Sequence, residues 1–344
     1  MTDRLARTSS PAAIDDDLAR LWRVAGRDGP VARAVMANLV VYVDRPATED
    51  VDLEAPIEGV PVDDVAQRHP SRLILLHHGG RANPSAPIGA AIGILLFGPP
   101  DARFGVETIA VRSACADASL PSIVRRLSLG DMPTSIWWTA DVSHTMPLAA
   151  LVAMGRQFIY DSRQWSDVRR GVLALATLIA RDHPPDLADV NWRRLTPIRL
   201  ALTQAIAPPI GPLALGAAVD VRAQIRHRAG DAALAWLLAG WLSARLARAE
   251  AAHEPATVEE DPQGDEVLTV ALAASDAPGV AVVTATMNEH RVRVAYAGRA
   301  APFSIAAPRE TDADAVAAEL GTLTYDAELR EALLALSQRW TPSL

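Results

Sequence analysis

Short apolar segments rich in β-branched residues alternate along this chain with segments whose apolar residues recur at helical spacing. In the first half, the expected strands cover residues 72–78, 88–98, 104–113, 134–138 and 157–162, and residues 35–43 are expected to form a strand or a helix-to-strand segment. The expected helices cover residues 14–26, 63–69, 120–129 and 147–155, and a longer helix follows a cap at Ser166. Strands that alternate with helices predict an α/β domain in which at least part of the sheet is parallel.

The second half repeats this pattern after Pro208 and Pro209. A helix with Thr196 as N-cap precedes the break, and residues 250–265 are acidic and small, as in a loop. The strands expected beyond the break are 213–225, 267–274, 280–287 and 292–298, and the helices are 233–249, 312–321 and 326–338. We therefore predict two successive α/β domains, with a mixed α+β arrangement as the alternative, whose mixed sheets are flanked by helices. The predicted domains are residues 1–207 and 208–344.

The composition excludes several kinds of protein. Half of the 344 residues are hydrophobic and 22% are charged, which is typical of a folded globular chain. Every basic side chain is arginine, because the sequence contains no lysine, and this excludes phosphate-binding, Schiff-base and general-base lysines. A net charge of −8 without a compact basic run argues against nucleic-acid binding.

The cellular compartment is also predicted from the composition. The single cysteine, Cys115, cannot form a disulfide within the chain or a cysteine-based zinc site, which fits a reducing cytoplasm. Three consecutive aspartates, residues 15–17, stand where a signal peptide would need apolar residues. No apolar stretch approaches the roughly 20 residues of a membrane span. We expect a soluble cytoplasmic protein that binds no membrane.

The motifs of common enzyme classes are absent from the sequence. It has no glycine-rich nucleotide loop, nucleophile elbow or zinc-protease helix. The His77–Gly80 run resembles the oxyanion loop of hydrolases but lacks an accompanying nucleophile. His69, His77 and His78 are interpreted as polar residues at strand ends, because adjacent residues of a strand point to opposite faces. We predict no catalytic residue, no cofactor and no metal.

Five motifs, taken in order, resemble the OpcA family of glucose-6-phosphate dehydrogenase assembly proteins. They are His69–Arg72, Glu107–Ile109, the run 127–133 that leads to Trp137 and Trp138, Phe158–Ser162, and the run 189–199 that reads DVNWRRLTPIR. Segments 236–246 and 318–321 match more weakly, and residues 79–87 depart from the pattern. The resemblance implies a non-catalytic subunit, or an assembly or allosteric activating factor, that binds glucose-6-phosphate dehydrogenase in the oxidative pentose phosphate pathway.

Tryptophan and arginine are enriched at protein interfaces, so the motifs also suggest where a partner would bind. Each candidate has a structural alternative: the paired tryptophans end a core strand, the aspartate can cap a turn, and the arginines can lie on a solvated face. The partner-interface candidates are Trp137, Trp138, Asp161, Asn191, Trp192, Arg193, Arg194 and Arg199. Two other functions stay open: a sugar-phosphate-binding or hydrolytic α/β enzyme, in which the same arginines bind phosphate, and a scaffold without kinetic effect.

Overall fold

A computed structural model describes residues 3–27, 29–45, 52–79, 88–99, 101–206, 221–248, 253–274, 281–297, 301–322 and 325–341. By its internal contacts the chain divides into two compact units, which are described separately. Unit 1 comprises Met1–Tyr160, Arg181–Ala188 and Thr311–Thr324. Unit 2 comprises Asp161–Ala180, Asp189–Glu310 and Tyr325–Leu344.

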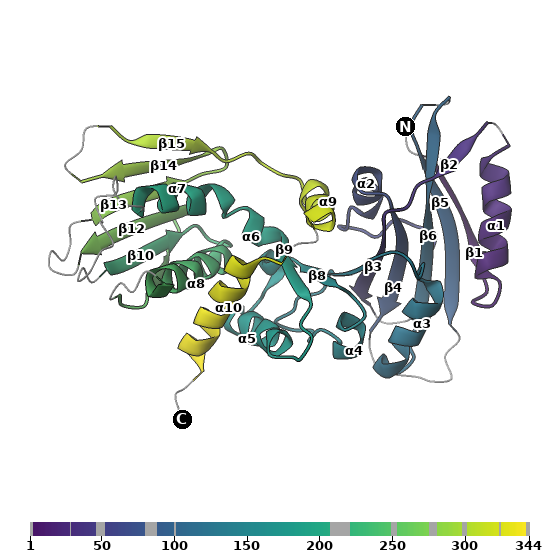
Figure 1. The fold of residues 1–344 in the computed structure, drawn as a ribbon, viewed down its shortest axis with the longest axis horizontal. Coiled ribbons are helices and arrows are strands. Elements are labelled where there is room, and N and C mark those ends of the chain that lie inside the picture. Colours follow the sequence, from purple (N-terminus) through teal and green to yellow (C-terminus); the bar gives the residue numbers. More distant parts are fainter. Residues whose placement is uncertain are drawn as a thin grey trace. The chain divides into compact units, whose positions relative to one another are not determined.

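A nine-stranded sheet forms the centre of unit 1, in the order β1-β5-β6-β4-β3-β7-β8-β9, with β2 paired to β6 (Figure 1). Its strands are β1 (Asp3–Ser9), β2 (Val31–Arg33), β3 (Ala37–Asp44), β4 (Ser71–His78), β5 (Gly89–Phe97), β6 (Arg103–Ser113), β7 (Thr134–Trp138), β8 (Gln157–Tyr160) and β9 (Asp186–Asp189). The ladders that join β6, β4, β3, β7 and β8 are parallel, and β5 is antiparallel to both β6 and β1. This succession is that of a doubly wound sheet, in which the chain extends the sheet first to one side of β3 and then to the other.

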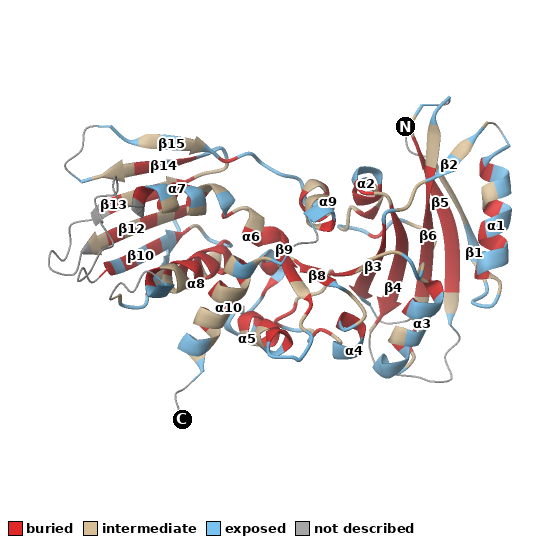
Figure 2. Cartoon of the chain, viewed as in Figure 1, coloured by how far each residue is buried: buried red, intermediate tan, exposed pale blue. Residues whose placement is uncertain are grey.

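Burial explains why the central strands of unit 1 read as continuous apolar runs. Every residue of β4 is buried, as are all residues of β3 except Asp44 (Figure 2). A parallel sheet covered on both faces requires this pattern, whereas a half-exposed sheet would show alternation. The helices of this unit are α1 (Ile14–Ala25), α2 (Val62–Arg68), α3 (Leu120–Leu127), α4 (Ala149–Val152) and α9 (Asp312–Thr322), with a short 3₁₀ turn η1 (Asp117–Ser119).

Helix α9 belongs to unit 1 although it is close to the end of the sequence. It packs against α2, where the Arg68 guanidinium donates to the Asp314 carboxylate. The Gln157 side-chain amide donates to the Glu319 carbonyl at 3.0 Å and ties the same helix to β8. The expectation that both terminal helices close the second domain is therefore wrong for α9, because these long-range contacts outweigh proximity in sequence.

Unit 2 contains a six-stranded sheet in the order β11-β10-β12-β13-β14-β15. Its strands are β10 (Val221–His227), β11 (Thr257–Glu260), β12 (Leu268–Ala274), β13 (Ala281–Met287), β14 (Arg291–Tyr296) and β15 (Phe303–Ala306). All neighbours are antiparallel except β10 and β11. Residues of β10 alternate between buried and exposed, as in a sheet with one covered face.

Helices of unit 2 cover the buried face of this sheet and pack on one another. The helical elements are η2 (Ser162–Gln164), α5 (Val168–Ile179), α6 (Val190–Arg193), α7 (Thr196–Ile206), α8 (Ala232–Arg248) and α10 (Ala327–Trp340). Helix α7 contacts β13, β14 and β15, α8 contacts β10 and β11, and α10 packs on α5 and α8. The prediction of mixed α/β sheets flanked by helices is confirmed by both units.

Several elements differ from the sequence-based expectations. Strands β1, β2, β9, β11 and β15 were not predicted, because short or polar edge strands have weak apolar signals and depend on pairing with a neighbour. The N-cap of α5 is Asp167, whose carboxylate accepts the Arg170 N–H at 3.0 Å, and not Ser166. Only residues 221–225 of the expected strand 213–225 are described. The predicted boundary between residues 207 and 208 lies outside the described residues and stays a prediction.

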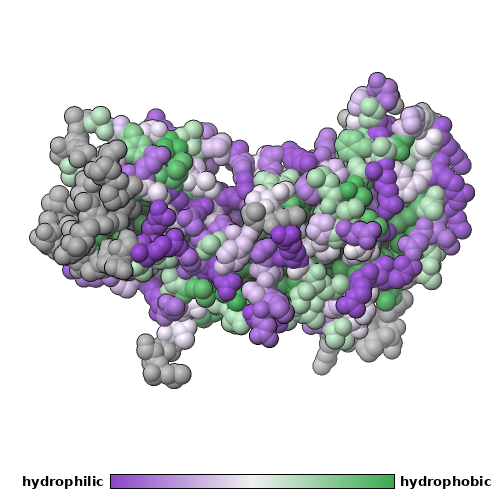
Figure 3. All heavy atoms as spheres, viewed as in Figure 1, coloured by the Kyte–Doolittle hydropathy of each residue, from purple (hydrophilic) through white to green (hydrophobic). Residues whose placement is uncertain are grey.

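No helix in the described part of the chain is long and apolar enough to cross a membrane. Hydrophilic and hydrophobic side chains are interspersed on the face visible in the space-filling view (Figure 3).

Candidate functional site

Asp189 connects two of the sequence motifs at the start of α6. Its Oδ1 accepts the Asn191 N–H at 2.9 Å and the Ser162 N–H at 3.0 Å, and Asn191 Nδ2 donates to Ser162 Oγ at 3.0 Å. Burial, followed by the nearby charge of Asp161, raises the pKa of Asp189 from 3.8 to about 7. The Asp161–Ser162 turn and the Asp189–Trp192 run therefore form one buried polar network, which determines the position of the arginines that follow.

Trp192 and Arg199 attach this run to α10. The Trp192 ring is 3% exposed, and its Nε1 donates to Asp326 Oδ2 at 2.8 Å. The Arg199 guanidinium lies 4.0 Å from the centre of the Trp192 ring, and its Nη1 donates to Glu328 Oε2 at 2.6 Å. Asp326 and Glu328 are the N-cap and a first-turn residue of α10, so these contacts stabilise the packing of unit 2.

Arg193 and Arg194, which directly follow Trp192 in the sequence, extend toward solvent. Arg193 donates from Nε and Nη2 to the two carboxylate oxygens of Glu310, both at 2.9 Å. Arg194 Nη1 donates to Asn191 Oδ1 at 2.9 Å and to Asp231 Oδ1 at 3.0 Å. Their side chains are 26% and 31% exposed, so each guanidinium is held by carboxylates and still reaches the surface.

These two arginines line a cavity of about 630 Å³ in unit 2, which we call the arginine groove. Its wall combines five arginines, three carboxylates and an apolar floor. The charged lining residues are Arg163, Arg193, Arg194, Arg228, Arg309, Asp231, Glu289 and Glu310. Arg228 Nη2 donates to Asp231 Oδ2 at 3.1 Å and to Glu289 Oε1 at 3.0 Å, which joins the turn before α8 to the β13–β14 hairpin.

The remaining predicted interface residues do not belong to the lining of this groove. Trp137 and Trp138 are 6% and 0% exposed in β7, and the Trp138 ring stacks on Tyr42 with 3.8 Å between ring centres. Both rings therefore pack in the core of unit 1. Asp161 caps η2, where it accepts the Arg163 N–H at 2.9 Å and also binds that guanidinium. Their role at a partner interface stays a prediction.

The sequence did not point to Arg163, Arg228, Arg309, Asp231 or Glu310, or to the role of Glu289. One local signal was available, because Asn288 and Glu289 lie between the expected strands 280–287 and 292–298, as in a hairpin turn. Five separated segments contribute the charged lining residues, and no local pattern in the sequence shows that they converge.

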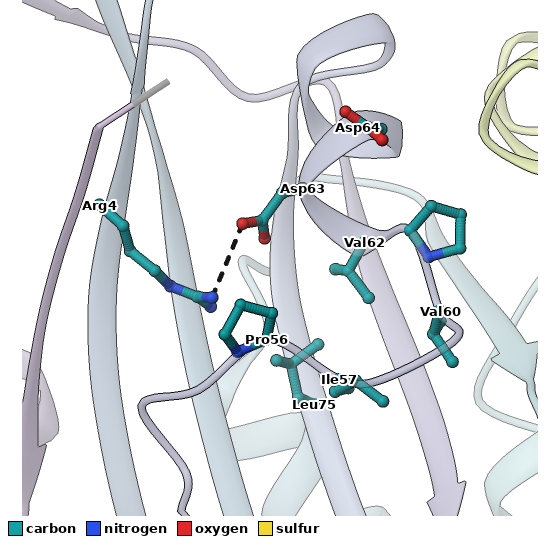
Figure 4. Close-up of a pocket in the computed structure, with 9 residues that line it drawn as sticks. Arg4, Pro56, Ile57, Val60, Val62, Asp63, Asp64 and Leu75 are labelled. Carbon is teal, nitrogen blue, oxygen red and sulfur yellow. Dashed lines mark ion pairs between the residues drawn. The ribbon is translucent and has the colours of Figure 1, made fainter. Parts of the chain in front are cut away.

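The described residues of unit 1 also enclose a cavity. This cavity of about 140 Å³ in unit 1 is lined by Arg4, Asp63, Asp64 and apolar residues, and Arg4 Nη1 lies 3.6 Å from Asp63 Oδ2 (Figure 4). This volume is below the usual range for small-molecule sites. Within the described ranges, no three His, Cys, Asp or Glu side chains are grouped so that they could hold a metal. Burial lowers the pKa of His77 to about 4, so its ring is neutral near pH 7.

Comparison with known families gives matches to two adjoining domains. Residues 62–177 match the model described as glucose-6-phosphate dehydrogenase subunit N-terminal domain. Residues 185–333 match the corresponding C-terminal domain. The two matches occur in the expected order and together span most of the chain.

Curated relatives and solved structures add weaker similarities. Two proteins named "Putative OxPP cycle protein OpcA" match: that of Synechocystis is 29% identical over 125 residues (36% of this chain, 26% of its own length), and that of Nostoc punctiforme is 30% identical over 194 residues (54% and 39%). The chain thus spans well under half the length of either relative.

A biliverdin reductase from Synechocystis shares 11% identity over 87% of this chain and 96% of its own, with a TM-score of 0.42. An oxidoreductase from Sinorhizobium meliloti shares 8% identity over 89% and 99%, also with a TM-score of 0.42. Such TM-scores are too low to establish a shared fold.

Proposed function

Because the chain belongs to the OpcA family of glucose-6-phosphate dehydrogenase subunits, we propose that it is a non-catalytic protein that binds this dehydrogenase and assists its assembly or activity. The observation that supports this best is the ordered match to both domains of such a subunit, at residues 62–177 and 185–333. The relatives named for the OxPP cycle support the same metabolic setting. We place the protein in the cytoplasm together with its partner.

The proposed contact surface is the rim of the arginine groove around Arg193 and Arg194. Both guanidiniums are partly exposed and already held by carboxylates, so a partner would immobilise little additional side-chain freedom. Arginine is enriched among residues that dominate binding energy. Asn191, Trp192 and Arg199 support this rim from within the unit. Trp137 and Trp138 are left out of the proposed surface because they are buried.

Titration of purified dehydrogenase with this chain tests the proposal. We expect Arg193→Ala to weaken binding by about 2 kcal/mol or more, since a charged contact at a desolvated interface is lost. Arg291→Ala, an exposed arginine of β14 outside the groove lining, is the matched control and should keep wild-type affinity. Wild-type affinity of the Arg193→Ala protein, with its fold unchanged by circular dichroism, would move the contact surface elsewhere.

The enzymatic alternative needs its own assay. The purified chain, incubated alone with pentose-phosphate intermediates, should show neither dehydrogenase nor lactonase turnover. Turnover that a single substitution abolishes would contradict the non-catalytic role. A dehydrogenase whose kinetics do not change when the chain binds would instead support the scaffold.

A further inference from the structure

The arginine groove has the size of a small-molecule site. Its volume of about 630 Å³ lies within the roughly 300 to 1,000 Å³ that such sites occupy. All of its lining residues belong to unit 2, so the site is complete within one unit. They come from η2, α6, α7, the turns before α8 and β12, the β13–β14 hairpin, β15 and the segment that follows it.

The charge of the lining has the opposite sign to that of the whole protein. Five arginines and three carboxylates line the groove, which leaves an excess of two positive charges, whereas the chain has a net charge of −8. An acidic chain repels anions overall, and a local excess of arginine offsets this repulsion at the groove. Guanidinium groups match the geometry of phosphate oxygens and donate in pairs.

One carboxylate in the groove interacts with three of the lining guanidiniums. Glu289, on the β13–β14 hairpin, accepts from Arg228 at 3.0 Å. Its pKa lies below 4.5, mainly because of the hydrogen bond from Arg228 and further because of the charges of Arg228, Arg194 and Arg309. Three guanidiniums from three segments therefore act on one small region of the groove. The carboxylates of Asp231 and Glu310 keep two of the lining arginines, Arg194 and Arg193, in place without a ligand.

The floor of the groove suggests that the ligand contains carbon as well as an anion. Apolar side chains lie beside the charged ones, among them Leu200, which is 49% exposed. The apolar lining residues are Pro197, Leu200, Ala229, Val267, Met287, Ile305, Ala306, Ala307 and Pro308. An inorganic ion would leave this surface in water, whereas the carbon skeleton of a metabolite would cover it.

We propose that the arginine groove binds a small phosphorylated metabolite, whose phosphate lies near Arg194, Arg228 and Arg309 and whose carbon skeleton lies on the apolar floor. Ligand binding requires no dehydrogenase, although the ligand site shares Arg194 with the rim proposed as the partner surface. Glu289 opposes an incoming phosphate by charge and also holds Arg228 in position. Neutralising Glu289 and removing Arg309 should therefore change ligand affinity in opposite directions.

Isothermal titration of the full chain tests this inference. The probes are glucose 6-phosphate, adenosine monophosphate and inorganic phosphate, with glucose as the uncharged control. We expect saturable one-to-one binding of at least one organic phosphate, tighter than that of inorganic phosphate, and no binding of glucose. Affinity should fall as salt rises, because exposed charges are screened. Failure of all three phosphates to bind, or equal affinity for inorganic phosphate and both organic phosphates, would overturn the proposal.

Three substitutions test whether the organic phosphate binds in the arginine groove. Arg309→Ala removes an exposed arginine and should weaken binding of the organic phosphate about tenfold or more, because one hydrogen bond between charged groups is lost. Glu289→Gln should strengthen binding, because it removes the opposing negative charge. Arg291→Ala should leave affinity unchanged. Binding that none of these substitutions changes lies outside the groove and refutes the site. A dehydrogenase complex that forms normally while Arg309→Ala loses the metabolite would separate this site from the partner surface.

Discussion

The two units each contain a cluster of arginines around a glutamate, and the clusters differ mainly in exposure. In unit 1, Glu107 accepts from Trp22 at 2.7 Å and from Arg33 at 2.9 Å, and Arg72 Nε lies 3.3 Å from it. The Glu107 and Arg72 side chains are 5% and 9% exposed. In unit 2, the Glu289 and Arg228 side chains are 39% and 38% exposed beside an open groove. The same residue types therefore stabilise a fold where they are enclosed and offer charge to a ligand where they are open.

Breaking the enclosed cluster should have the largest effect. Glu107→Ala leaves the buried Arg72 without its main counter-charge, so we expect the free energy of unfolding to fall by about 3 to 5 kcal/mol. Urea unfolding followed by circular dichroism measures this loss. Glu58→Ala, at an exposed position of the same unit, is the control and should change stability by less than about 0.5 kcal/mol. A Glu107→Ala protein as stable as this control would show that burial does not distinguish the clusters.

A second prediction concerns the pH dependence that Asp189 gives to unit 2. Its pKa, raised from 3.8 to about 7, means that the folded chain binds this proton more tightly than the unfolded chain. This tighter proton binding stabilises the folded chain fully at pH values below the pKa of Asp189 in the unfolded chain. The stabilisation is lost as pH rises through about 7, by at most about 1.4 kcal/mol per pH unit.

The substitution Asp189→Asn tests this dependence, because it places an uncharged amide where the second carboxylate oxygen of Asp189 now lies buried without a hydrogen-bond partner. The variant should therefore gain stability relative to wild type as pH increases between about 4 and 7. Comparing the two proteins at each pH cancels the titration of other groups such as His77. A difference that does not vary with pH would mean that Asp189 is ionised throughout this range.

Arg199→Ala should have an intermediate effect, because the Arg199 side chain is only 13% exposed but its carboxylate partner Glu328 is 40% exposed. The substitution removes its contact with the Trp192 ring and its hydrogen bond to Glu328, so we expect a loss of about 1 to 2 kcal/mol. Thermal and urea unfolding measure it, with Arg291→Ala as the exposed control. If dehydrogenase binding is lost while stability is unchanged, Arg199 belongs to the contact surface and not to the packing of unit 2.

The smallest effect on stability is expected for Glu289→Gln in the open cluster. Exposed ion pairs contribute about 0 to 1 kcal/mol, so unfolding of this variant should differ from wild type by no more than that. The same variant should nevertheless bind organic phosphates more tightly. A large loss of stability would show that the open cluster is a structural one, like that around Glu107.

The sequence predicted elements well where apolar residues are continuous or regularly spaced. The expected strand 134–138 coincides with β7, and the strand expected at 104–113 begins one residue earlier, at Arg103. Prediction failed at β9, within a proline-containing stretch, and at β11, whose TVEE sequence has little apolar character. Such short strands are held by main-chain hydrogen bonds to neighbours that are distant in sequence, and no local pattern contains that information.

The candidate site could be predicted only in part, for a similar reason. The DVNWRRLTPIR run pointed to Arg193 and Arg194, which do line the groove, but it did not separate them from the buried Asn191 and Trp192. The pattern of residue types gives the helix and its arginines, whereas exposure depends on what packs against each face. For the same reason, the local sequence does not identify Arg228, Arg309 and Glu289 as residues that line the groove.

The sequence alone determined the family, the two mixed α/β sheets and the dependence on arginine for every positive side chain, because these follow from local patterns and composition. Only the tertiary structure decided which arginines are enclosed and which are open. It brought Arg72 next to Glu107 inside unit 1 and gathered Arg194, Arg228 and Arg309 around Glu289 in unit 2. The physical reason is that the energy of a charge depends on its distance to other charges and to water, and chain folding sets both distances between residues far apart in sequence.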